Sequence, residues 1–119
     1  MTPQELRACC LGQNGTSEDV PFPRSPGLTV FRVAEKIFAF CALEERPLKV
    51  SLKCDPEEAI RLRETHPAIT PGWHLNKRHW NTVTVPELPP RMVRELIEDS
   101  YDLVVATLPK PTRLRLDRP

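Results

Sequence analysis

The stretch from residue 73 to residue 82 holds the side chains best suited to chemistry. Its ten residues include two Trp, two His, two Asn, one Lys and one Arg. In a nucleic-acid site, Lys77 and Arg78 would contact phosphate groups while an indole or imidazole ring stacks on a base. The candidate DNA-binding residues of this stretch are His74, Asn76, Lys77, Arg78, His79, Trp80 and Asn81.

Two other interpretations of the same stretch stay open. In an enzyme, His74 or His79 would serve as a general base oriented by an Asn or a carboxylate. In a structural role, Trp73 and Trp80 would be core residues, and the Asn side chains would satisfy backbone groups of a loop. The residues alone do not decide among the three.

A second group of cations lies on predicted strands. Residues 48–53 alternate apolar and polar, which places Lys49 and Lys53 outward, and Arg32 is out of phase with its apolar neighbours. In hairpin register, Arg32, Lys49 and Lys53 would share a face with Lys77 and Arg78. The alternative is that exposed lysines protect strand edges and keep the protein soluble.

The total charge requires that any anion site be a local patch. Among 119 residues, 17 Lys and Arg nearly balance 16 Asp and Glu, for a formal net charge of +1. The chain has four glycines and no Gly-rich phosphate loop, GxSxG or HExxH motif. The spacing of the three histidines matches no metal-ligand template. We therefore expect no catalytic residue, cofactor or metal.

The chain has the features of a cytoplasmic protein. It contains no apolar run long enough to cross a bilayer and does not begin with an export signal, so no membrane partner is expected. The four cysteines form no CxxC motif and have no zinc-ligand spacing, which is typical of small core residues in a reducing compartment. The sequence does not determine the oligomeric state, and we favour a monomer.

Proline and glycine mark the predicted elements of the first half. A capping box with Pro at the first helical position predicts a helix over 3–12, followed by a loop over 14–27. Strands are expected over 28–33, 36–43 and 48–53 because these runs are rich in β-branched and aromatic residues. The two residues Ala34 and Glu35 predict a tight hairpin between the first two strands.

The second half should hold two helices and two strands. Asp55 as N-cap and Pro56 at the first position predict a helix to about residue 65. Short strands are expected near 73–76 and 80–85. Apolar rows at i+4 predict a long helix over 89–108, and the remaining basic segment is expected to be loose. This order, α-β-β-β-α-β-β-α, predicts one α+β domain over 1–109 with a basic C-terminal tail over 110–119. Its architecture would be a two-layer sandwich, with the long C-terminal helix packed on an antiparallel sheet.

The block from Leu75 to Thr82, LNKRHWNT, resembles the signature of the MmcQ/YjbR family of small bacterial proteins. The segments TSEDVPF, FRV with KIFA, LKCDPE and SYDLV are similar to further family blocks, so that the resemblance covers about residues 2–109. It implies an α-β3-α-β2-α fold, in agreement with the order above.

The resemblance also implies DNA binding through a double-wing arrangement, at positions Lys53, Asn76, Lys77, Arg78 and Trp80. It implies no catalytic residue set. The leading hypothesis is therefore a non-enzymatic DNA-binding protein that uses the local basic patch. The alternative is a protein-interaction or small-ligand module that uses the open sheet face with Trp73 and Trp80.

Overall fold

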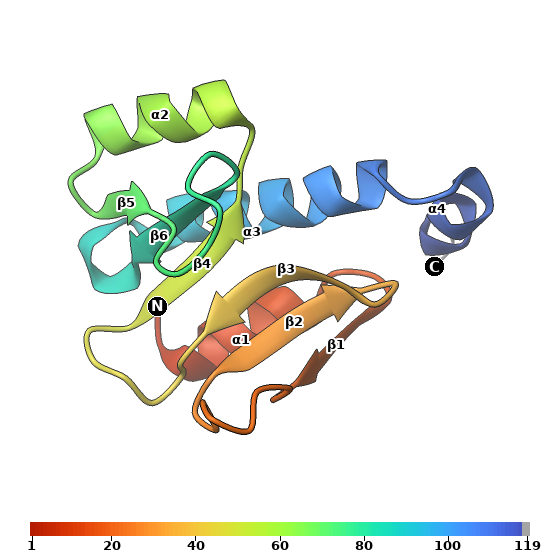
Figure 1. Ribbon diagram of the computed structural model, residues 1–119, viewed down its shortest axis with the longest axis horizontal. Helices are drawn as coiled ribbons and strands as arrows, with labels where there is room; N and C mark the ends of the chain where they lie inside the picture. The colour runs from red at the N-terminus through yellow and green to blue at the C-terminus, as the bar shows by residue number, and fades with distance from the viewer. Residues whose placement is uncertain (118–119) are drawn as a thin grey trace.

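The computed structural model describes residues 1–117 as an α+β fold with one antiparallel sheet and helices on one of its faces (Figure 1). The six strands lie in the order β1-β2-β3-β4-β6-β5. Their bounds are β1 Thr16–Asp19, β2 Thr29–Val33, β3 Lys36–Cys41, β4 Lys49–Lys53, β5 Ile69–Pro71 and β6 Trp80–Thr84. The helices are α1 Pro3–Leu11, α2 Pro56–Thr65, the 3-10 turn η1 Val85–Glu87, α3 Pro90–Ala106 and α4 Lys110–Leu116. The predicted fold class is confirmed.

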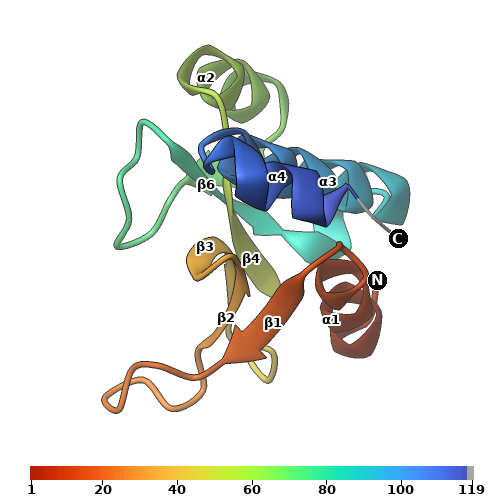
Figure 2. The same ribbon diagram turned by 90° about the vertical axis from the view of Figure 1, so that its right-hand side faces the viewer.

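The core lies between the sheet and helices α1 and α3. Helix α3 packs across β2, β3 and β4, while α2 packs on β5 and β6. The inward side chains of β4, which the alternation predicted, are buried with the apolar side of α3. Figure 2 shows that the β1–β2 and β5–β6 loops project from the other side of the sheet. Within residues 1–117, no helix has the length and apolar character needed to cross a membrane.

Local capping explains where α1 and α2 begin. Thr2 and Glu5 form the predicted capping box, and Pro3 occupies the first position of α1. The Asp55 carboxylate accepts hydrogen bonds from the backbone N–H groups of Glu57 and Glu58 at the start of α2. Helix α2 ends before Pro67, as predicted.

The tight hairpin between β2 and β3 is confirmed. Ala34 and Glu35 both have positive φ, 47° and 69°, as a type I′ turn requires. The register shifts between Phe31 and Arg32, so that Arg32 pairs with Ile37 and Phe31 with Ala39. This bulge lets Phe38 and Ala39 both reach the core.

Three local predictions are wrong. The segment 14–27 is not all loop, because Thr16–Asp19 forms edge strand β1 by backbone pairing with β2. The strand expected near 73–76 is a turn region, and the partner of β6 is Ile69–Pro71 instead. The tail is not loose over its whole length, since Lys110–Leu116 is helix α4. Residues 118–119 of the predicted tail lie outside the described residues.

Helix α4 is held by contacts with a segment that is distant in sequence. The Asn14 side chain donates a hydrogen bond to the Leu116 carbonyl at 2.9 Å, and the Leu116 side chain lies against Gly15. Gly15 has a φ of 70° and no room for a β-carbon, which would lie 2.4 Å from Leu116 Cδ2. Tertiary contacts of this kind leave no periodic signal in the sequence.

Candidate nucleic-acid interface

The loop over residues 72–79, between β5 and β6, carries most of the predicted site. At its base the Gly72 N–H donates to the Trp80 carbonyl at 2.8 Å. A β-carbon on Gly72 would lie 2.7 Å from Trp80 Cβ and 2.9 Å from the Trp80 carbonyl oxygen. The Trp73 N–H donates to Thr82 Oγ1 at 3.1 Å. Only glycine therefore allows the two sides of this hairpin to approach so closely.

Asn76 and Lys77 stabilise the loop from within. Asn76 Oδ1 accepts from the Arg78 N–H at 3.0 Å, and the Asn76 carbonyl accepts from the N–H groups of His79 and Trp80. Lys77 Nζ donates to the Gly72 carbonyl at 2.9 Å, although the residue is exposed. Asn76 and Lys77 therefore both satisfy backbone groups of the loop. This role was predicted for the Asn side chains but not for Lys77.

Asn81 connects the loop to α2 and is not available at the surface. It is 3% exposed, and its Nδ2 donates to the Ala59 carbonyl at 3.4 Å. Arg63 Nη1 donates to Asn81 Oδ1 at 3.1 Å and to the Lys77 carbonyl at 2.8 Å. Arg63 was not among the residues predicted for this region from the sequence. The available signal was a lone basic residue in the last turn of the predicted helix.

The two indoles lie in different environments. Trp73 is 73% exposed, and its ring lies against the ring of His74, with ring centroids 3.9 Å apart. His74 is also exposed and has a φ of 58°. Trp80 is half-buried and packs edge-to-face on Phe40, with centroids 5.3 Å apart. The interpretation of both indoles as core residues is therefore wrong for Trp73.

The predicted strand cations lie on the open face but do not form one cluster. Arg32 donates to Asp19 Oδ2 at 2.8 Å and to the Glu35 carbonyl at 3.0 Å, so its charge is locally balanced. Lys53 lies opposite Trp80 in the β4–β6 ladder, next to the loop. Lys49 lies at the other end of β4, about 13 Å away by the rise of a strand.

Arg78 and Lys53 are the cations nearest the loop whose charged groups have no hydrogen-bond or ion-pair partner among residues 1–117. Arg78 is exposed, and its guanidinium makes no hydrogen bond or ion pair with residues 1–117. The Lys53 ammonium, likewise, has no such partner in that range, although its backbone N–H donates to Ser100 Oγ at 2.9 Å. His79 is half-buried beside them. The structure thus joins an exposed indole, an imidazole and two cations around one loop.

The comparisons with known proteins agree on one family. The YjbR family model matches residues 11–103. Uncharacterized protein YjbR of Escherichia coli K12 is 35% identical over 114 residues, which cover 95% of each chain. Uncharacterized protein YbdF of Escherichia coli O157:H7 is 34% identical over 96 residues, which cover 80% of this chain and 79% of the relative.

Solved structures extend the likeness to three dimensions. A Deinococcus radiodurans protein of domain DUF419 superposes with a TM-score of 0.90 at 37% identity, covering 99% of this chain and 89% of its own. A Pseudomonas syringae protein superposes with a TM-score of 0.76 at 31% identity, and the match covers 87% of this chain and 98% of the other. The resemblance inferred from the LNKRHWNT block is confirmed, and the chain belongs to the YjbR family.

Proposed function

We propose that this protein is a non-enzymatic DNA-binding protein of the cytoplasm that binds single-stranded DNA at the loop over residues 72–79. The observation that carries the proposal is the exposed indole of Trp73, held on a hydrogen-bonded loop beside free cations. An exposed tryptophan costs solvation free energy, and stacking on a base offsets that cost. Bases are open to such stacking in single strands.

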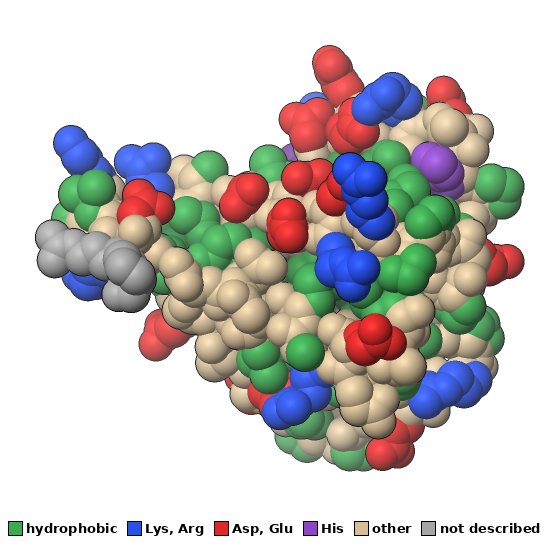
Figure 3. All heavy atoms as spheres, turned by 180° about the vertical axis from the view of Figure 1, so that it is seen from behind, with side chains coloured by type: hydrophobic (Ala, Val, Ile, Leu, Met, Phe, Trp, Pro, Cys, Tyr) green, Lys and Arg blue, Asp and Glu red, His purple; other side chains and the backbone are tan. Residues whose placement is uncertain are grey.

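The distribution of charge supports the same surface. Arg78 lies in the loop, Lys53 lies next to its base, and Lys49 extends the positive charge along the open face. Figure 3 shows the molecule from behind, and on this face acidic and basic side chains are interspersed. Helix α3, on the other side of the sheet, carries four acidic and two basic residues, so a phosphate backbone would be attracted to the loop rather than to this helix.

The histidines favour binding over catalysis. A general base needs a position in a pocket where a substrate is held, with a group that orients the imidazole. His74 projects into solvent against Trp73, and His79 lies at the base of the loop. Neither lines the groove that lies between α2 and α3. Both are better placed to contact a nucleic acid than to abstract a proton from a bound substrate.

A titration at two salt concentrations tests the proposal. Fluorescein-labelled dT12 should show an anisotropy increase that weakens with salt, by about 0.7 log units of affinity per log unit of salt for each neutralised phosphate. Replacing Arg78 by Ala should lower this slope by about 0.7. Arg91→Ala, which removes the same charge from the opposite side, is the control. Absence of binding at low salt, or an equal effect of both variants, would contradict the proposal.

A second candidate function, protein binding at the open face, is supported by exposed apolar side chains. Val20 and Phe22, on the β1–β2 loop that projects from the same side of the sheet as the 72–79 loop, are 51% and 39% exposed. Together with Trp73 they give the open face apolar contacts of the kind that a protein partner would cover. If this candidate is correct, Phe22→Ala should weaken partner binding, while dT12 should produce no anisotropy change.

A further inference from the structure

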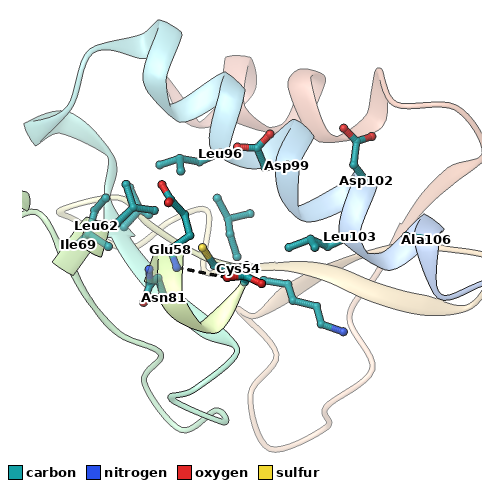
Figure 4. Close-up of a pocket in the computed structure, with 14 residues that line it drawn as sticks. Cys54, Glu58, Leu62, Ile69, Asn81, Leu96, Asp99, Asp102, Leu103 and Ala106 are labelled. Atoms are coloured by element: carbon teal, nitrogen blue, oxygen red, sulfur yellow. Dashed lines mark hydrogen bonds between the residues drawn. The ribbon is translucent and has the colours of Figure 1, made fainter. Parts of the chain in front are cut away.

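A groove of about 360 Å³ lies between α2 and α3, on the helix-covered side of the sheet (Figure 4). It exists because α2 packs on β5 and β6 whereas α3 packs on β2, β3 and β4, which leaves the region over β4 and β6 open. Its apolar lining consists of Leu52, Leu62, Ile69, Val83, Leu96 and Leu103. The volume is at the small end of the range for ligand pockets, so a small molecule fits better than a peptide helix about 10 Å wide.

Carboxylates surround the mouth of this groove. Figure 4 shows Glu58 on α2 and both Asp99 and Asp102 on α3 at its rim. Asp55 and Lys53 also line it, so the lining residues carry four carboxylates. Lys53 is an outward residue of β4, so its ammonium group belongs to the open face rather than to the groove. The Asp55 carboxylate is occupied by the backbone of α2, and Glu58 pairs with Arg61 at 2.5 Å. Asp99 and Asp102 form no ion pair with residues 1–117.

The rim carboxylates repel one another. Partial burial raises the pKa of Asp99, and the charges of Asp102, Glu95 and Glu58 raise it further. A cation between these groups would relieve the repulsion, while an apolar body attached to it would cover the leucines below. A negatively charged ligand would instead be repelled by these carboxylates.

We propose that this groove binds a small organic cation, namely a primary amine carried on an apolar chain or ring. The ammonium group lies between Glu58, Asp99 and Asp102, and the apolar part covers the floor formed by Leu52, Leu62 and Leu103. This site is separate from the loop over residues 72–79 and does not depend on DNA binding. Its specificity combines charge at the rim with apolar contact below.

The experiment uses the full chain and n-hexylamine as the probe, with 1-hexanol and hexanoate as matched neutral and anionic compounds. Two-dimensional NMR of the amide groups should show saturable shifts for hexylamine at Cys54, Leu62 and Leu103. Hexanol should bind at least tenfold more weakly, and hexanoate should produce no saturable shift.

Variants test the assignment of the rim. The double variant D99N/D102N should weaken hexylamine binding at least tenfold, because both unpaired carboxylates are removed. Glu98→Gln, a charge removal on the same helix outside the groove, should change it less than threefold. Ala106→Phe, at an exposed position of the lining, should block binding while thermal unfolding shows that the fold is kept.

Three results would overturn the proposal. They are a failure of hexylamine to bind, binding no tighter than that of hexanol, and an affinity for hexylamine that D99N/D102N leaves unchanged. Trp73→Ala should leave hexylamine binding unchanged, which separates this site from the proposed DNA interface.

Discussion

Arg63 of α2 and Asn81 of β6 are joined by a hydrogen bond of 3.1 Å from the guanidinium Nη1 to the side-chain Oδ1. The same nitrogen donates to the Lys77 carbonyl at 2.8 Å, so one residue of a helix holds both a buried amide and the loop of the proposed DNA interface. The conformation of that loop therefore depends on a residue 18 positions away in sequence from Asn81.

Replacing Arg63 by Ala should destabilise the protein by about 1–3 kcal/mol, because the buried Asn81 oxygen and the Lys77 carbonyl lose their donor. Arg61→Ala is the matched control, since it removes an exposed ion pair with Glu58 that is worth less than about 1 kcal/mol. Urea denaturation measures both free energies of unfolding. Equal losses in the two variants would contradict the role assigned to Arg63.

Gly72→Ala should cost about 1–3 kcal/mol, because the new methyl group would lie 2.7 Å from Trp80 Cβ and force the hairpin apart. Gly27→Ala provides the comparison, since no atom lies within 4 Å of the β-carbon at that position. There we expect no loss, or a gain of up to about 1 kcal/mol from the lower entropy of the unfolded chain. Thermal and urea unfolding should both separate the two variants, and similar stabilities would show that the hairpin is not closely packed at Gly72.

The Cys54 thiol should react slowly although it is only half-buried. Burial, together with the carboxylates of Glu58, Asp55 and Asp99, raises its pKa to about 11. The thiolate is the reactive form, so at pH 8 alkylation by iodoacetamide should be at least tenfold slower than that of free cysteine. The rate should keep rising with pH until about 11.

A charge variant tests the cause of the raised pKa. In a Cys9→Ser background, which removes the other half-buried thiol, Glu58→Gln should lower the pKa of Cys54 and speed its alkylation. Glu64→Gln, at an exposed position of the same helix, should change the rate less. A rate unaffected by Glu58→Gln would contradict the contribution of the Glu58 charge to the raised pKa of Cys54.

Most of the fold follows from local patterns in the sequence. The i+4 rows of α3, the proline-marked starts of α1 and α2, and the two-residue hairpin at Ala34 and Glu35 each need only a few neighbouring residues to specify them. Strand β1 was missed because Thr16–Asp19 has no apolar alternation, and its structure comes from pairing with β2. Helix α4 was missed because contacts with Asn14 and Gly15 hold it in place.

The candidate site was predictable in position but not in detail. The composition of residues 73–82 correctly drew attention to the loop, yet the separation of roles within it depends on tertiary contacts. Lys77 and Asn81 hold the structure through Gly72 and Arg63, whereas Arg78 and Trp73 remain at the surface. The groove between α2 and α3 had no signal in the sequence, because its lining comes from five separate elements and the segment that joins β4 to α2.

The most direct test of the central claim uses the fluorescence of Trp73 itself. Trp80→Phe leaves Trp73 as the single tryptophan, and Phe retains the apolar contact with Phe40. Titration of this variant with dT12 at low salt should quench its fluorescence in a saturable way, and Trp73→Ala in the wild-type background should weaken binding by about 1–3 kcal/mol. Unchanged Trp73 fluorescence at saturating dT12, or equal affinity of Trp73→Ala and wild type, would contradict the account.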